Sequence, residues 1–142
     1  MAITQALCTS FKKELMEAKH NFLASDGSTF KIALYTSDAT LNQATTAYSA
    51  TNEVSGTGYT TGGATLTRVD PSSSGTVAFA DFANVSWPSS SFTCRGALIY
   101  NDSVGNRAVM VLNFGVDKTV SSGTFTVTFP TADSTNAIIR ID

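Results

Sequence analysis

The sequence predicts a mainly β protein, an antiparallel β-sandwich or jelly roll with one N-terminal α-helix. Apolar residues recur at helical spacing only in the first two dozen positions. After Gly27 their spacing changes to two, and short alternating stretches follow, each bounded by Gly, Ser, Asn, Asp or Pro. Because no strands alternate with helices, a doubly wound sheet is not indicated.

The length of 142 residues indicates a single domain, with a helix over 1–24 and a β-sandwich over 28–142. The helix is predicted from apolar residues at spacings of three and four, which are Leu7, Phe11, Leu15, Ala18 and Phe22. Thr4 is placed to cap its start, and Asp26-Gly27 to end it. Its apolar face packs either on the domain's own sheet, which we favour, or on a partner subunit.

Alternating stretches predict the strands, which lie at 30–36, 76–82, 92–101, 108–114, 123–130 and 136–141. Phe125, Val127 and Phe129 face one way and threonines the other, which is typical of a strand with one side in solvent. The stretches 95–101 and 108–114 are apolar on both faces, as expected of central strands. The Asn-Asp and Gly-Asn pairs between them predict a hairpin.

The stretch 37–63 reads as a long polar loop, and such loops are usually functional or ordered by a partner. Its glycines are Gly56, Gly58, Gly62 and Gly63. A phosphate-binding P-loop needs a lysine after the last glycine, and a dinucleotide fingerprint needs a helix. Here Ala64 and a threonine-rich strand follow instead. We therefore predict that the glycines supply turns with positive φ.

No arrangement of residues predicts catalysis, so we expect no enzymatic activity, no cofactor and no metal. His20 is the only histidine and is expected near the end of the helix, where its partial charge is favourable. Ser10 and Lys13 match the SxxK pattern of serine penicillin-recognising enzymes, but the accompanying SDN and KTG motifs are missing. The aspartates fall mostly in turns, where they bond to the backbone.

Composition and charge exclude further classes. With nine Lys and Arg against eleven Asp and Glu, the chain lacks the basic field of a nucleic-acid-binding protein. No stretch is apolar for long enough to span a bilayer, and no secretory leader is visible, so we expect a cytoplasmically made protein without a membrane partner. Cys8 and Cys94 could form a disulfide, but their apolar surroundings favour two buried free thiols.

Taken together, several stretches resemble a family of small virion structural proteins of tailed bacteriophages. They are ITQALCTSFKKELM (3–16), FKIALYTSDATLN (30–42), AYSATNEVSGTGYTTGGATLT (47–67), RGALIYND (95–102), VLNFG (111–115) and AIIRID (137–142). The resemblance covers nearly the whole chain. It lies in the sequence and order of these segments as a whole, and none of them is a motif with a defined chemistry. It implies a capsid decoration (cement) protein, a homodimer or homotrimer that binds the major capsid protein of a virion assembled in the host cytoplasm.

A clamp of this kind needs a rigid core, a contact surface and arms that reach a neighbour. The loop 37–63 and the N-terminal segment are candidate arms, and Tyr48 and Tyr59 are candidate interface anchors. Trp87 is either an interface residue or a core residue that shares a strand face with Val85. Two alternatives stay open: a tail component (fibre, baseplate or adaptor), and a carbohydrate-binding module whose aromatic rings stack on sugars.

Overall fold

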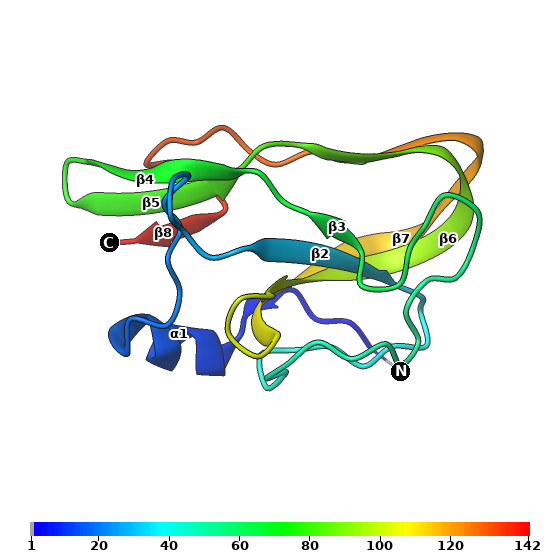
Figure 1. Ribbon diagram of the computed structural model, residues 1–142, viewed down its shortest axis with the longest axis horizontal. Helices are drawn as coiled ribbons and strands as arrows, with labels where there is room; N and C mark the ends of the chain where they lie inside the picture. The colour runs from blue at the N-terminus through cyan, green and yellow to red at the C-terminus, as the bar shows by residue number, and fades with distance from the viewer. Residues whose placement is uncertain (1) are drawn as a thin grey trace.

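The alternating stretches form two antiparallel sheets in the computed structural model, which describes residues 2–142 (Figure 1). The larger sheet has the strand order β1-β7-β6-β2-β3 and the smaller one the order β4-β5-β8. The elements are β1 (Ala6–Leu7), α1 (Thr9–Met16), β2 (Phe30–Tyr35), β3 (Ala64–Thr65), β4 (Arg68–Ser74), β5 (Val77–Phe82), β6 (Val85–Asn101), β7 (Arg107–Val127) and β8 (Ile139–Ile141). The predicted mainly β, sandwich-like fold is confirmed.

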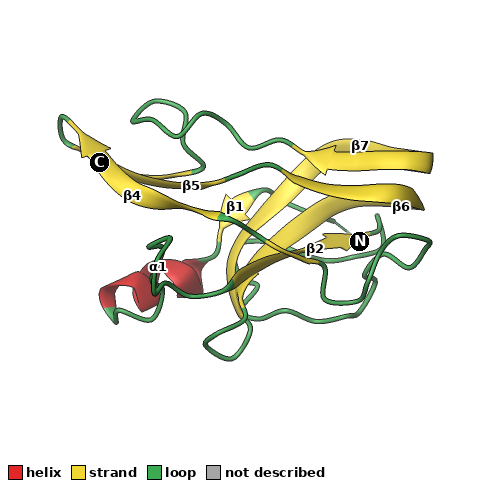
Figure 2. Cartoon of the chain, turned by 45° about the horizontal axis from the view of Figure 1, so that its top comes forward, coloured by secondary structure: helices red, strands yellow, loops and turns green. Residues whose placement is uncertain are grey.

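A long hairpin of β6 and β7 forms the centre of the larger sheet and extends towards the smaller one (Figure 1). The two strands pair from Asn101 and Arg107, beside the predicted hairpin loop, to Val85 and Val127 at the open end. The register shifts several times along the way, and such bulges bend a strand and increase its twist. The hairpin therefore curves out of the larger sheet and returns over it towards β4 and β5 (Figures 1 and 2).

These bulges also explain why the predicted strand boundaries were wrong. The stretches 108–114 and 123–130 were predicted as separate strands, but they belong mostly to the single strand β7. Gly115 and Ser122, which suggest breaks in the sequence, have positive φ angles of 82° and 46° and lie inside the strand. A bulge accommodates such residues without ending the pairing.

Aromatic rings from both layers build much of the core. The ring of Phe22 stacks on that of Phe30 with a centroid distance of 4.4 Å, and Phe30 lies 5.6 Å from Phe82 of the smaller sheet. Phe82 in turn lies 5.8 Å from Phe129, which follows β7. Buried aromatic pairs stabilise a fold beyond the area that they bury. This row of rings therefore holds the two layers together.

The prediction of an N-terminal helix over 1–24 was wrong in length: α1 has only eight residues. Before it, β1 pairs with β7, so Thr4 does not cap the helix, and Cys8 takes the N-cap position without a side-chain hydrogen bond. After it, Ala18 has a left-handed backbone with a φ of 59°, a conformation that ends helices. No helix within residues 2–142 is long and apolar enough to cross a membrane.

The predicted helix was too long because Phe22, in the loop after α1, lies at helical spacing from Phe11 and Leu15 and is buried as they would be in a helix. Phe22 is buried although it lies in irregular structure, and Asp26-Gly27 belongs to a separate turn. The helix packs on the domain's own sheet, as favoured, with Phe11 fully buried. The prediction that His20 lies near the helix end was wrong: His20 is buried in the loop that follows α1.

A buried polar network fixes this segment to the β6–β7 hairpin. Glu14 of α1 accepts a hydrogen bond from Arg107 (2.6 Å) and interacts with Nε2 of His20 (2.9 Å). The other ring nitrogen of His20 lies 3.0 Å from the side-chain amide of Asn101, which is fully buried. Buried polar groups need such partners, so α1, its loop and the hairpin end must take up their positions together.

We expect Glu14→Gln to lower the free energy of unfolding by about 2–3 kcal/mol at neutral pH, because an amide cannot replace a buried carboxylate with two partners. Burial opposes ionisation, but His20 and Arg107 hold the pKa of Glu14 below its ordinary value of 4.5. The difference in the free energy of unfolding between the wild type and Glu14→Gln is therefore complete above about pH 4.5. It is lost as the pH falls through the lower pKa of Glu14 in the folded state.

Urea titrations of both proteins between neutral pH and about pH 3 measure this difference. Glu17→Gln is the matched control, because Glu17 is the exposed C-cap of the same helix and, within residues 2–142, forms an ion pair with Lys13 alone. We expect it to change stability little. A Glu14→Gln effect that does not depend on pH would contradict the assignment.

Candidate interaction surface

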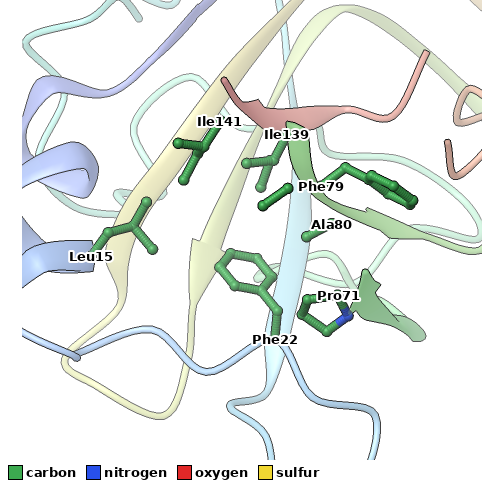
Figure 3. Close-up of a pocket in the computed structure, with 8 residues that line it drawn as sticks. Leu15, Phe22, Pro71, Phe79, Ala80, Ile139 and Ile141 are labelled. Atoms are coloured by element: carbon green, nitrogen blue, oxygen red, sulfur yellow. The ribbon is translucent and has the colours of Figure 1, made fainter. Parts of the chain in front are cut away.

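An apolar hollow lies between α1 and the smaller sheet. In Figure 3, Leu15 of the helix, Phe22 of the loop and Ile141 of β8 point into the same space. Its volume is about 130 Å³, and its lining consists of Leu15, Phe22, Pro71, Ala78, Phe79, Ala80, Ile139 and Ile141. None of these side chains is charged or polar. The hollow therefore suits aliphatic or aromatic groups.

The hollow continues along the helix into a second one of about 300 Å³. The two share Leu15, Ile139 and Ile141, and the second is also lined by Leu7, Phe11, Lys12, Met16 and Arg140. We call the two together the α1–β8 groove. Its size falls within the range of small ligand pockets and of the anchor sites of protein interfaces.

Large apolar side chains are exposed at this groove. Met16, the last residue of α1, is 85% exposed, and Ile141 is 56% exposed. Leu15 lies one helical turn beyond the buried Phe11 and is only partly covered. A contiguous apolar patch is costly to leave in water, and such patches commonly mark protein interaction sites. The groove is therefore the main candidate surface.

Arg68 of β4 fixes the wall that carries Phe22. Its guanidinium donates to the carbonyl oxygens of Leu23 (2.7 Å), Ala24 (2.9 Å) and Ser28. Asp70 of the same strand accepts a hydrogen bond from the backbone of Ala24 at 2.7 Å. Hydrogen bonds to charged groups are stronger than neutral ones. The loop after α1 is thus bound to β4, and Phe22 keeps its place in the groove.

The charged side chains at the groove are basic. Lys12 and Arg140 line its outer part and are exposed. Neither forms an ion pair with another residue in the range 2–142. The groove thus combines an apolar floor with a positive rim.

The predicted loop 37–63 is ordered around one carboxylate, that of Glu53. One oxygen of Glu53 accepts hydrogen bonds from the hydroxyl of Tyr59 (2.5 Å) and the backbone of Gly62 (2.8 Å). The other oxygen accepts one from the hydroxyl of Tyr48 (2.7 Å). A single side chain therefore holds three distant points of the loop.

The remaining two of the chain's four tyrosines attach this loop to the larger sheet. Tyr35 donates to the carbonyl of Ser49 (2.7 Å), and Tyr100 donates to that of Gly62 (2.6 Å). The hydroxyl of Tyr59 also accepts a hydrogen bond from the backbone of Leu34 in β2 (2.9 Å). The loop is therefore structured before any partner arrives, which lowers the entropic cost of binding.

The prediction that the loop glycines supply turns with positive φ is confirmed for three of the four. Gly58, Gly62 and Gly63 have φ angles of 82°, 98° and 80°, which L-residues rarely adopt. Gly56 does not have a positive φ; it is needed because a Cβ there would lie 2.5 Å from the carbonyl oxygen of Ser91. The cluster is thus a close-packed bend of the loop.

The structure brings the three predicted interface residues into one cluster, because Tyr48 and Tyr59 share the carboxylate of Glu53 and Tyr59 contacts Trp87. Tyr59 and Trp87 stack with a centroid distance of 6.2 Å, whereas Tyr48 stacks on Tyr100 at 4.6 Å. Trp87 is only 5% exposed, so the core alternative describes its position. Tyr48 and Tyr59 are half-buried with their hydroxyls turned to Glu53. A role for them at an interface stays a prediction.

The groove residues were not predicted from the sequence. A signal existed, because Leu7, Phe11 and Leu15 have helical spacing and Ile139 and Ile141 share a strand face. Nothing in the sequence places these two sets beside each other, since they lie at opposite ends of the chain.

The two cysteines are buried and unpaired, which confirms the favoured prediction. Burial raises the pKa of the Cys8 thiol to about 11 and that of Cys94 to about 12. Both thiols are therefore protonated and unreactive near neutral pH.

Comparison with known proteins adds no assignment, because no protein family, curated protein or solved structure matches the chain.

We expect Tyr59→Phe to lower the free energy of unfolding by about 1–3 kcal/mol, because the carboxylate of Glu53 and the backbone of Leu34 each lose a hydrogen bond. Hydrogen exchange should accelerate in the loop, with the larger effect around Glu53 and Gly62. Thr51→Ala, at an exposed position of the same loop where the hydroxyl accepts an exposed hydrogen bond from Ser49, should change both quantities little. Unaltered exchange in Tyr59→Phe would contradict the proposed role of Glu53.

The tyrosines also predict an alkaline pH dependence. Burial raises the pKa of all four above the ordinary value of 10, to about 12 for Tyr100, and the bonds to Glu53 add to this for Tyr48 and Tyr59. The unfolded phenols ionise near pH 10 while the folded ones stay neutral, so stability should fall as the pH rises above about 10. Ultraviolet absorbance should show no phenolate step near pH 10 until the protein unfolds. A step there in the folded protein would contradict the buried network.

Proposed function

We propose that the protein is a non-enzymatic structural protein of a tailed-phage virion, a decoration protein that binds the major capsid protein as a homodimer or homotrimer. The observation that carries the binding part of this proposal is the exposed apolar α1–β8 groove. The phage context rests on the resemblance of the sequence to small virion proteins. The loop 37–63, already ordered around Glu53, supplies a second contact surface.

The physical properties of the domain suit such a component. A clamp transmits force between neighbouring subunits, so it must resist bending and must bind without large rearrangement. The stacked phenylalanines and the two buried polar networks supply the stiffness. The groove supplies apolar contact area, which is the main favourable term in protein association.

A tail component, such as a fibre, baseplate or adaptor protein, is the second candidate, because the same groove would serve there. The carbohydrate-binding alternative has less support: Trp87 is nearly covered by its neighbours, so its indole face is not free to stack on a sugar.

Copy number distinguishes the two virion positions. We expect quantitative mass spectrometry of purified particles to give a stoichiometry near one chain per capsid subunit, or one oligomer at each junction between capsomers. A count in the tens would assign the protein to the tail instead. Absence of the protein from washed particles would overturn both assignments.

The binding surface is tested by adding purified protein to particles that lack it. We expect Ile141→Asp and Met16→Asp each to reduce occupancy by about tenfold or more, because each places a charge in a desolvated contact. Val116→Asp is the matched control: Val116 is 57% exposed, against 56% for Ile141, but lies on β7 and does not line the groove. Equal losses in the variant and the control, with unchanged melting temperatures, would contradict the use of the groove.

A further inference from the structure

We propose that the α1–β8 groove binds an extended, acidic segment of the partner protein. The apolar side chains of this segment fill the groove, and a carboxylate meets Lys12 and Arg140 at its rim. The inference rests on the proposed function, since it specifies the chemistry of the partner that the same surface binds.

The shape of the groove selects side chains rather than a flat surface. Leu15, Ile139 and Ile141 are common to two adjoining hollows of about 130 and 300 Å³. Each hollow has room for an aliphatic or aromatic anchor, the kind of residue that dominates binding energy at protein interfaces. A planar lipid surface would cover the exposed Met16 but would leave the hollows unfilled.

The charge at the rim selects an acidic partner. Lys12 and Arg140 are the only charged residues that line the groove. Carboxylates on the same or adjacent segments already have partners: Glu14 bonds to Arg107 and His20 inside the domain, Glu17 pairs with Lys13, and Asp142 accepts from Thr76. Asp133, in the loop before β8, accepts from Asn136 and Thr135, and these bonds, with a smaller contribution from Arg140, lower its pKa. Because neither Lys12 nor Arg140 forms an ion pair with another residue in the range 2–142, a carboxylate from the partner would supply a direct counter-charge, and such complementarity sets specificity and orientation.

The strand beside the groove favours an extended backbone. Among the strands within residues 2–142, β8 pairs only with β5, so no strand from that range pairs with its other edge. The opposite edge of this sheet, β4, is protected by Pro71 and by a bulge between Val69 and Ser72, both of which hinder strand addition. A segment that lies along β8 can gain main-chain hydrogen bonds. Its side chains alternate, so every second one faces the groove.

The test selects binding peptides from a displayed library of random dodecapeptides, once with the wild type and once with the double variant Lys12→Glu/Arg140→Glu. We expect the wild type to enrich peptides with Asp or Glu among apolar residues at alternate positions. The double variant should bind these peptides about tenfold or more weakly, and should enrich Lys or Arg peptides instead. Ile141→Asp should lose both kinds of peptide, whereas Val116→Asp should bind like the wild type.

We expect thermal melts to show that every variant retains the fold, because all the substituted side chains are largely exposed. Enrichment of basic peptides by the wild type, or unchanged binding of acidic peptides by the double variant, would overturn the inference. So would the absence of peptide enrichment combined with sedimentation on vesicles of phosphatidylserine and phosphatidylcholine, which would identify an anionic membrane as the ligand.

This experiment uses purified protein and no particle, so it fails separately from the proposed function. Acidic peptides that bind to a protein absent from virions would refute the virion assignment and leave the groove's preference intact. A protein abundant on capsids that shows no preference for acidic peptides would refute the preference and leave the virion assignment intact.

Discussion

The bend in the β6–β7 hairpin is the constraint on which the rest of the structure depends. A straight strand of 21 residues would be about 70 Å long, whereas a domain of this length has a radius of gyration of only about 14 Å. The register shifts, the largest of which places Phe114–Asp117 opposite Arg95, let the hairpin turn back on itself. One pair of strands then supplies the centre of the larger sheet and leads directly, through a two-residue link from β5, to the smaller one. Near its closed end the hairpin pairs with β1 and β2, and at its open end it is joined to β5 by the chain.

The α1–β8 groove follows from that arrangement. In Figure 1 the smaller sheet and α1 lie at the same end of the molecule, one above the other, and the groove lies between their side chains. Phe11 is fully buried in the core, but Leu15 is only partly covered and Met16 is exposed. Charged groups hold both walls in place, since Glu14 ties the helix to the hairpin and Arg68 ties the following loop to β4. The apolar surface is therefore rigidly held open, as a binding surface must be if recognition is not to require refolding.

The tyrosine network likewise holds the loop 37–63 in place before any partner binds. A polar loop of this length would ordinarily lose much entropy on ordering. Here isolated β-bridges join the loop to the larger sheet at a few points, and Glu53 with four phenols adds side-chain hydrogen bonds between those points. The burial of those phenols raises their pKa values. Both surfaces are thus prepared in the free protein, which suits a component that adds to a finished assembly rather than one that folds with it.

Local patterns were enough to predict the fold class, the central strands, the turn glycines and the buried cysteines, because alternation, turn chemistry and apolar surroundings are properties of neighbouring residues. They also located the loop of Tyr48 and Tyr59, but not Glu53 as its centre. The length of the helix, the continuity of β7 and the groove were decided by contacts between segments far apart in the chain. Residues 6–7 become a strand only because β7 lies beside them, and Leu15 meets Ile141 only because the hairpin bends. Burial and pairing depend on such distant partners, which no local spacing records.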